Sequence, residues 1–152
     1  MRVALLALFL FPVLAFASAS GHAPAGTFTD TFLVVSEDVR DAARAGKRLI
    51  LFFEQEGCPA CLKMAQTTFP DREVAKTLQR GFVMVAIDLN GARETTWLDG
   101  RARPEKELAK HLDIRATPTV LILDPHGKVV QRFVGYRDPA AFRAILEAAA
   151  QK

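Results

Sequence analysis

Four apolar runs divide the chain, and each is bounded by polar, glycine or proline residues. The first three are continuous runs of aliphatic and aromatic residues, at 48–53, 82–89 and 119–124. Continuous runs of this length predict strands that are buried on both faces of a sheet. The fourth run, 128–136, follows the tight-turn sequence DPHG at 124–127. It is therefore predicted to form a hairpin with the third run.

Apolar residues at helical spacing fill the segments between these runs. The first helix is predicted to have Ser36 as its N-cap and to end at Gly46. Further helices are predicted over 59–69, 71–80, 104–112 and 138–150, the third of these four opening at Pro104. Strands and helices that alternate, followed by a hairpin and a last helix, predict an α/β fold. We expect a mixed central β-sheet of four core strands with helices on both faces.

A polar stretch at about 90–103 interrupts this alternation and is predicted to be an insert. Its Asp99-Gly100 pair suits a two-residue type I′ turn, so we expect the stretch to form a hairpin. Inserts of this length in a compact domain are often functional.

The first residues have the pattern of a signal peptide. Arg2 precedes an apolar run over 3–16, and small residues suited to cleavage follow. The run is shorter than the roughly 20 residues that span a bilayer. We therefore predict a signal peptide over 1–19, cleaved after Ala17 or Ala19. An uncleaved membrane anchor is the alternative.

The rest of the chain is long enough for one domain. Residues 20–32 begin with small, polar, proline- and glycine-bearing sequence and are predicted to be flexible, and 33–152 are predicted to fold as one domain. Half of the residues are hydrophobic, which argues against disorder. The net charge is +3 at pH 7, with the basic residues scattered among acids, so no nucleic-acid partner is predicted.

The only two cysteines of the chain, Cys58 and Cys61, lie in the sequence GCPACLK. Cys58 falls where a predicted strand ends and a helix begins, and a helix N-terminus stabilises a thiolate. In such places the pKa of a cysteine falls from about 8.5 to between roughly 3.5 and 7.5. We therefore predict that Cys58 is the nucleophile and that Cys61, nearly one helical turn later, resolves the mixed disulfide. Pro59 suits the first turn of the helix.

Two other roles for the cysteine pair are less favoured. A zinc site would need further ligands from His22, His111 and His126, and no second paired motif accompanies the cysteines. A permanent structural disulfide would close a loop of only about four residues, which stabilises little. A redox pair is favoured, with no metal and with the disulfide itself as the redox group.

A second motif precedes the third predicted strand. Thr117 and Pro118 stand just before the apolar run at 119–124. Proline cannot donate to a strand ladder, so it belongs at the start of a strand or on an edge. The Thr117–Pro118 bond is a candidate cis peptide, and a trans proline that starts the strand is the alternative.

Together these motifs resemble the thioredoxin superfamily. The resemblance rests on GCPAC, RATPTVLILD, the hairpin GKVVQRFVGY and the terminal helix, in that order. It implies that Cys58 attacks, that Cys61 resolves and that Pro118 is cis. It also implies that the Thr117 backbone pairs with the substrate chain, with Pro59 and Ala60 at the same substrate-binding surface.

A narrower resemblance concerns the exported thioredoxins of the SoxW kind, found with bacterial sulfur oxidation. It rests on LFFEQEGCPACLKM, ETTWLDG, EKELAKHLDIRATPT and GY. The resemblance implies a periplasmic reductase of protein disulfides. It also implies a membrane thiol transporter of the DsbD or CcdA type as the electron donor. We expect a monomer.

The chain departs from the family pattern in two places. Phe52 stands where many thioredoxins have a buried aspartate that relays a proton to the resolving thiol. Glu54, two residues later, shares its strand face and is a candidate substitute, with a solvated strand-end carboxylate as the alternative. Gly57 replaces the usual tryptophan before the first cysteine. Trp97 in the insert is a candidate replacement for that contact surface, or else packs the hairpin onto the domain.

The direction of electron flow is predicted from the residues between the cysteines. Pro59 and Ala60 provide neither a charge nor a side-chain donor to stabilise a thiolate. We therefore predict a reduction potential nearer about −270 mV than about −120 mV, and hence a reductase. An oxidase or isomerase of the same fold, and a non-catalytic docking module with a locked disulfide, are the alternatives.

Overall fold

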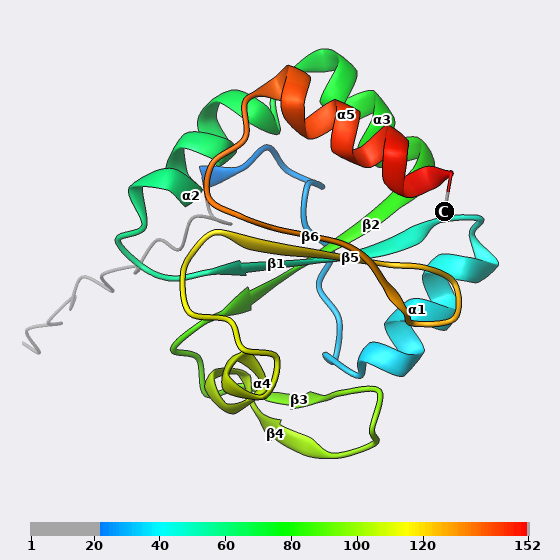
Figure 1. Ribbon diagram of the computed structural model, residues 1–152, viewed down its shortest axis with the longest axis vertical. Helices are drawn as coiled ribbons and strands as arrows, with labels where there is room; N and C mark the ends of the chain where they lie inside the picture. Colours follow the sequence, from blue (N-terminus) through cyan, green and yellow to red (C-terminus); the bar gives the residue numbers. More distant parts are fainter. Residues whose placement is uncertain (1–21, 152) are drawn as a thin grey trace, which may run out of the picture.

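A four-stranded mixed sheet forms the centre of the molecule. The computed structural model describes residues 22–151, so the predicted signal peptide lies outside the described residues. The strands are β1 (Arg48–Glu54), β2 (Phe82–Asp88), β5 (Thr119–Leu123) and β6 (Val129–Val134), in the order β2-β1-β5-β6 (Figure 1). β2 is parallel to β1, whereas β5 is antiparallel to both β1 and β6. The predicted α/β fold class and its four core strands are confirmed.

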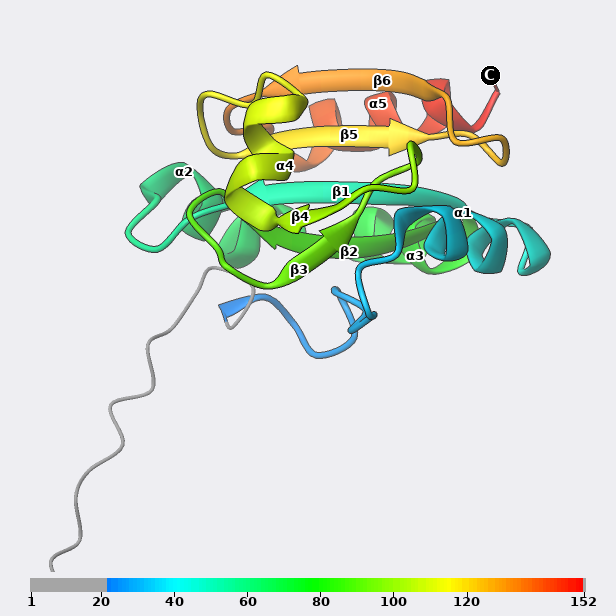
Figure 2. The same cartoon turned by 90° about the horizontal axis from the view of Figure 1, so that it is seen from below.

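Helices cover both faces of this sheet, as predicted. They are α1 (Val35–Arg44), α2 (Pro59–Lys63), α3 (Arg72–Gly81), α4 (Glu105–His111) and α5 (Pro139–Ala150), and a π-helical turn, η2 (Met64–Thr68), directly continues α2. Figures 1 and 2 show α2, α3 and α5 on one face, and α1 and α4 on the other. Within residues 22–151, none of the helices combines the length and apolar character that crossing a bilayer requires.

The side chains of β1 alternate between two hydrophobic clusters. Ile50 and Phe52 pack with residues of α2, η2, α3 and α5. Leu49, Leu51 and Phe53 pack with residues of α1 and α4. All five side chains are buried. The continuous apolar run of this strand therefore reflects a strand covered on both faces, because successive side chains point to opposite sides.

Two predicted helix starts differ from the structure, by two residues for α1 and by one residue for α4. α1 begins at Val35 with Val34 at the cap position, not at Ser36, and Val34 accepts the first backbone bonds of the helix. The reason is tertiary, since Val34 is held by a β-bridge to Thr96 of the insert. Pro104 caps α4 instead of opening it, because it is also the last residue of a short strand.

The insert forms the predicted hairpin, from β3 (Glu94–Thr96) and β4 (Ala102–Pro104). Its turn differs from the predicted two-residue type I′ turn, which needs positive φ at both central residues. Gly100 has φ +74°, whereas Asp99 does not have a positive φ. The Asp99 carboxylate instead accepts from the backbone N–H of Arg101 and from the Arg103 guanidinium, which fixes a longer loop.

Part of the segment predicted to be flexible, 20–32, contacts the domain. The Phe28 ring lies 5.5 Å from Phe52 and 5.7 Å from Phe69, between ring centroids. The Thr29 N–H donates to the Met84 carbonyl over 2.8 Å. Figure 2 shows this segment, in blue, beside β2. These contacts add an aromatic side chain to the core cluster on the α2 side.

Candidate active site

The cysteine pair lies where the central strand β1 gives way to a helix. β1 ends at Glu54, and a short turn follows in which Gly57 has φ +72°, a backbone conformation that favours glycine. The N–H of Cys58 donates to the Gln55 carbonyl, which closes the turn. Cys58 then occupies the N-cap position and Pro59 opens α2. This is the strand–helix junction that the sequence predicted for the thiols.

The two cysteines form a disulfide, with an S–S distance of 2.14 Å and a Cα–Cα distance of 5.3 Å. Cys61 is fully buried, whereas Cys58 keeps 7% of its surface exposed. The backbone N–H of Cys61 donates to Sγ of Cys58 over 3.1 Å. The same N–H would stabilise a thiolate on Cys58 once the disulfide is reduced, because it already points at that sulfur.

The Thr117–Pro118 peptide is cis. Pro118 is buried and Thr117 is half-buried. The Pro118 carbonyl accepts from the N–H of Gly135 over 2.7 Å, and the Thr119 hydroxyl donates to the Ala116 carbonyl. Figures 1 and 2 place the loop before β5 at the same end of the sheet as the start of α2. The two motifs, far apart in the sequence, therefore meet at one edge.

The remaining predicted site residues differ in exposure. Pro59 is exposed at the start of α2, and Ala60 is half-buried against the core cluster of the α2 side. Glu54 is only 3% exposed, so the alternative of a solvated carboxylate is wrong. It lines a cavity of about 410 Å³ that also contains Asp88, Arg93 and Glu105. Phe52, in the place of the family aspartate, packs in the same cluster as both cysteines.

Trp97 packs against the core cluster on the α1 and α4 face of the sheet. The insert hairpin lies on that face in Figure 1, whereas α2 covers the opposite face. Its structural role, packing the hairpin onto the domain, is therefore the one that the structure supports.

Sequence analysis gave no role to Tyr136, which the structure places against the cysteine-bearing helix. The Nζ atom of Lys63 lies 4.4 Å from the centroid of the Tyr136 ring, a cation–π distance. The Tyr136 hydroxyl lies 3.3 Å from the Thr67 hydroxyl. The pair GY at 135–136 was part of the family resemblance, but a sequence pattern does not say which distant residues a tyrosine contacts.

An ion pair between the buried Glu105 carboxylate and the partly exposed Arg93 side chain fixes the insert beside the end of β2. Glu105 is 1% exposed, and its carboxylate accepts from the Arg93 guanidinium over 2.6 Å. The hydrogen bond from Arg93 to Glu105 is the main cause that raises the pKa of the arginine above its ordinary value. The backbone N–H groups of Asp88 and Arg93 also donate to this carboxylate. A Cβ at Gly91 would collide with it, so the close approach requires glycine.

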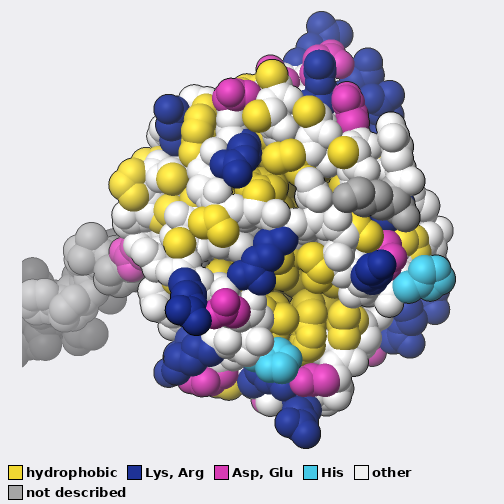
Figure 3. All heavy atoms as spheres, in the orientation of Figure 1, with side chains coloured by type: hydrophobic (Ala, Val, Ile, Leu, Met, Phe, Trp, Pro, Cys, Tyr) yellow, Lys and Arg dark blue, Asp and Glu magenta, His cyan; other side chains and the backbone are white. Residues whose placement is uncertain are grey.

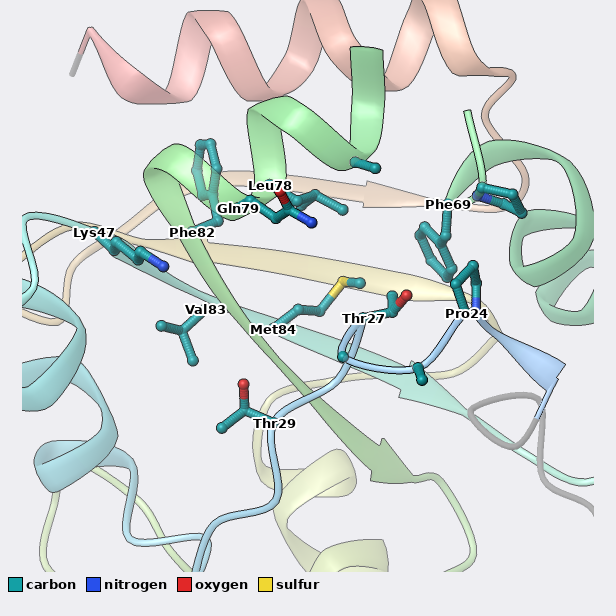
Figure 4. Close-up of a pocket in the computed structure, with 14 residues that line it drawn as sticks. Pro24, Thr27, Thr29, Lys47, Phe69, Leu78, Gln79, Phe82, Val83 and Met84 are labelled. Atoms are coloured by element: carbon teal, nitrogen blue, oxygen red, sulfur yellow. The ribbon is translucent and has the colours of Figure 1, made fainter. Parts of the chain in front are cut away.

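A second cavity lies away from the cysteines. It measures about 380 Å³ between the N-terminal segment, β2 and α3 (Figure 4). Pro24, Phe69, Phe82 and Met84 are among its lining residues, and neither cysteine is. The cavity is therefore separate from the redox pair.

Metal-ligating side chains do not gather into a site in the described part of the chain. Across residues 22–151, no group of three or more histidine, cysteine or acidic side chains could hold a metal ion. On the face shown in Figure 3, lysine and arginine side chains are scattered among acidic and apolar ones.

Comparisons with known proteins agree on the fold. Residues 35–150 match a family described as a thioredoxin-like domain. The chain is 31% identical over 136 residues to the thiol:disulfide interchange protein DsbD of Salmonella paratyphi A, which covers 87% of this chain and 22% of the relative. DsbD of Klebsiella pneumoniae is 27% identical over 121 residues, covering 78% of this chain and 19% of the relative. The chain thus spans about a fifth of the length of the curated relatives that it matches.

Solved structures share the architecture. A thioredoxin-fold protein from Helicobacter pylori superposes with a TM-score of 0.61 at 21% identity, covering 79% of this chain and 81% of that one. A thioredoxin from Thermus thermophilus superposes with a TM-score of 0.59 at 25% identity, covering 76% of this chain and 82% of that one. The oxidised C-terminal domain of Neisseria meningitidis DsbD gives 0.56 at 20% identity, covering 80% of this chain and 97% of that domain.

Proposed function

The chain belongs to the family of thioredoxin-like domains, and on that basis we propose that it is a thiol–disulfide oxidoreductase that reduces disulfides in proteins. The observation that carries the proposal is the Cys58–Cys61 disulfide at the junction of β1 and α2. The cis Pro118 loop lies at the same end of the sheet. The DsbD relatives are named as thiol:disulfide interchange proteins, which supports the same chemistry for this domain.

In the proposed reaction, the thiolate of reduced Cys58 attacks one sulfur of a substrate disulfide. The substrate S–S bond breaks, its second sulfur leaves as a thiolate, and a mixed disulfide joins Cys58 to the substrate. The Cys61 thiol then loses its proton and attacks Sγ of Cys58, which releases the first substrate sulfur. Two electrons pass to the substrate, and the Cys58–Cys61 disulfide of the structure is the oxidised product.

The substrate chain is proposed to lie along the cis-proline loop. The Thr117 backbone is assigned to pair with it, as the family resemblance implies, while Pro118, Pro59 and Ala60 form the contact surface. Pro59 is exposed beside Cys58, so a neighbouring chain can approach the less buried of the two sulfurs.

Glu54 is proposed to accept the proton of Cys61 in the second step. The carboxylate is buried at the end of β1 and shares a strand face with Phe52, which packs in one cluster with both cysteines.

We expect Glu54→Gln to slow the resolution of the mixed disulfide at pH 7 by at least about tenfold, because Cys61 loses its proton acceptor. Rapid-mixing measurement of thiol release reports this step. Glu56→Gln is the matched control, since Glu56 is an exposed carboxylate two residues away. Equal rates for the two variants would exclude the relay role of Glu54.

The proposal extends to the direction of electron transfer and to the partners of the protein. A reducing pair in the periplasm would receive its electrons from a membrane thiol transporter of the DsbD or CcdA type. The predicted signal peptide would deliver the chain there, and a monomer suffices for the chemistry. The SoxW-like assignment stays a prediction, since the relatives found are DsbD proteins.

The reductase direction is tested by equilibrating the protein with glutathione redox buffers. The dipeptide Pro59-Ala60 offers no side-chain stabilisation of a thiolate, so we expect a potential nearer about −270 mV than about −120 mV. A value above about −160 mV would contradict reduction and favour the oxidase or isomerase alternative. The protein with both cysteines replaced by serine is the blank for the thiol readout.

A further inference from the structure

The helix that carries the cysteines changes character three residues after Cys61. α2 ends at Lys63, and η2 follows with a π-helical bond from the N–H of Phe69 to the Met64 carbonyl over 3.0 Å. A π turn adds one residue, which rotates the later residues by about 100° relative to a continuous α-helix. The last two residues of η2, Thr67 and Thr68, both contact the loop that joins β6 to α5.

These contacts are specific hydrogen bonds. Thr68 is fully buried, and its hydroxyl donates to the Arg137 carbonyl over 2.7 Å. The Thr67 hydroxyl donates to the Lys63 carbonyl, so the Tyr136 hydroxyl is the donor in the 3.3 Å contact between Tyr136 and Thr67. The Lys63 ammonium lies over the ring of the same tyrosine. We call the contacts of Lys63, Thr67 and Thr68 with Tyr136 and Arg137 the brace.

The loop that the brace holds is also bonded to the cis-proline segment. The N–H of Gly135 donates to the Pro118 carbonyl over 2.7 Å, and Gly135 has φ +86°, which favours glycine. One residue earlier, Val134 pairs with Thr119 in the sheet. Residues 135–137 therefore connect the cysteine helix to the segment that contains Thr117 and Pro118.

We propose that Thr68 and Tyr136 are positioning residues, which hold the Thr117–Pro118 segment at the spacing from Cys58 that a protein substrate requires. The inference rests on the proposed function. A protein disulfide must meet both Cys58 and the backbone before Pro118, so a loosened brace misplaces one contact relative to the other. A small disulfide reacts with Cys58 alone, so its rate of reduction does not depend on that spacing.

The test compares one large and one small disulfide in the same variants. For Thr68→Val and Tyr136→Ala, we expect kcat/KM for insulin reduction to fall about tenfold, mostly through KM, because misplacement of a binding segment weakens productive alignment. The rate with the aromatic disulfide dithiobis(nitrobenzoate) should stay within about twofold of the parent. Thr68→Ser keeps the hydroxyl and should restore insulin reduction.

Thr77→Val is the control for the loss of a threonine hydroxyl that donates to a backbone carbonyl, because Thr77 donates to the Glu73 carbonyl within α3 and is not part of the brace. If Thr68→Val and Tyr136→Ala lose the same fraction of activity with both disulfides, together with a lower melting temperature, the positioning role is overturned. A loss of insulin reduction in Thr77→Val as large as in Thr68→Val would also overturn it. Failure of the proposed function has a different signature, since the parent protein itself would then reduce neither disulfide.

Discussion

Replacing Cys58 with serine is expected to abolish insulin-disulfide reduction, with a loss of at least about a thousandfold. A serine hydroxyl at neutral pH does not attack a disulfide sulfur, whereas the Cys58 thiolate does, and the Cys61 sulfur is fully buried and cannot take over. The measurement is the turbidity of reduced insulin, or the consumption of a thiol donor, with parent and variant at equal concentration.

The matched variant is Cys61→Ser, which keeps the nucleophile and removes the resolving thiol. It should accumulate a mixed disulfide between Cys58 and the substrate that survives denaturation without reductant. Trapping with this variant in the native host would identify the protein substrates or the donor. A non-catalytic docking module predicts the opposite pattern, in which neither serine variant changes any reaction and no substrate is trapped. Retained reduction in Cys58→Ser would therefore disprove the proposed function.

Replacing Glu105 with alanine is expected to lower the free energy of unfolding by about 3 kcal/mol, because removing a buried, hydrogen-bonded carboxylate leaves its backbone donors unsatisfied. The Glu105 carboxylate is 1% exposed, and it accepts from the Asp88 N–H, the Arg93 N–H and the Arg93 guanidinium. This loss is at the lower end of the range usual for breaking a buried ion pair, because the Arg93 side chain is 58% exposed and can be hydrated again. Urea unfolding followed by circular dichroism gives the measurement.

Glu107 offers the control on the same helix. It forms an exposed ion pair with Lys110 over 2.9 Å, and exposed pairs contribute little to stability. We expect Glu107→Ala to unfold close to the parent midpoint. Glu105→Ala should still reduce insulin under conditions where it is folded, since the ion pair lies with the insert and not with the cysteines. Coincident unfolding curves for Glu105→Ala and Glu107→Ala would show that the Arg93–Glu105 pair does not anchor the insert.

Most of the fold could be predicted from the sequence, because most strands and helices are specified by patterns of neighbouring residues. The apolar run of β1 is continuous since the strand is covered on both faces, and the alternation of its side chains between two clusters follows from strand geometry. The position of Cys58 followed in the same way from the end of that run and the proline that opens α2. Thr117 and Pro118 were found because a proline before an apolar run has few other places in a sheet.

Two predictions failed where other contacts outweigh the preference of a short sequence pattern. Ser36 has the right side chain for an N-cap, but a bridge to Thr96 fixes Val34, and the helix starts two residues earlier. Asp99-Gly100 suits a type I′ turn, but the Asp99 carboxylate bonds to Arg101 and Arg103 and builds a longer loop. At Ser36 a cap preference of about 1 kcal/mol competes with a contact to a segment distant in the sequence. At Asp99 the turn preference competes with side-chain hydrogen bonds to residues two and four positions later.

The sequence by itself determined the order of strands and helices and the strand–helix junction that holds the cysteine pair, because these depend on neighbours within a few residues. Only the tertiary structure decided that Glu54 is buried, that Arg93 pairs with Glu105, and that Tyr136 contacts the cysteine-bearing helix. Each of these depends on which segments the folded chain brings together, and the burial of a side chain is a property of its surroundings and not of its own position in the sequence.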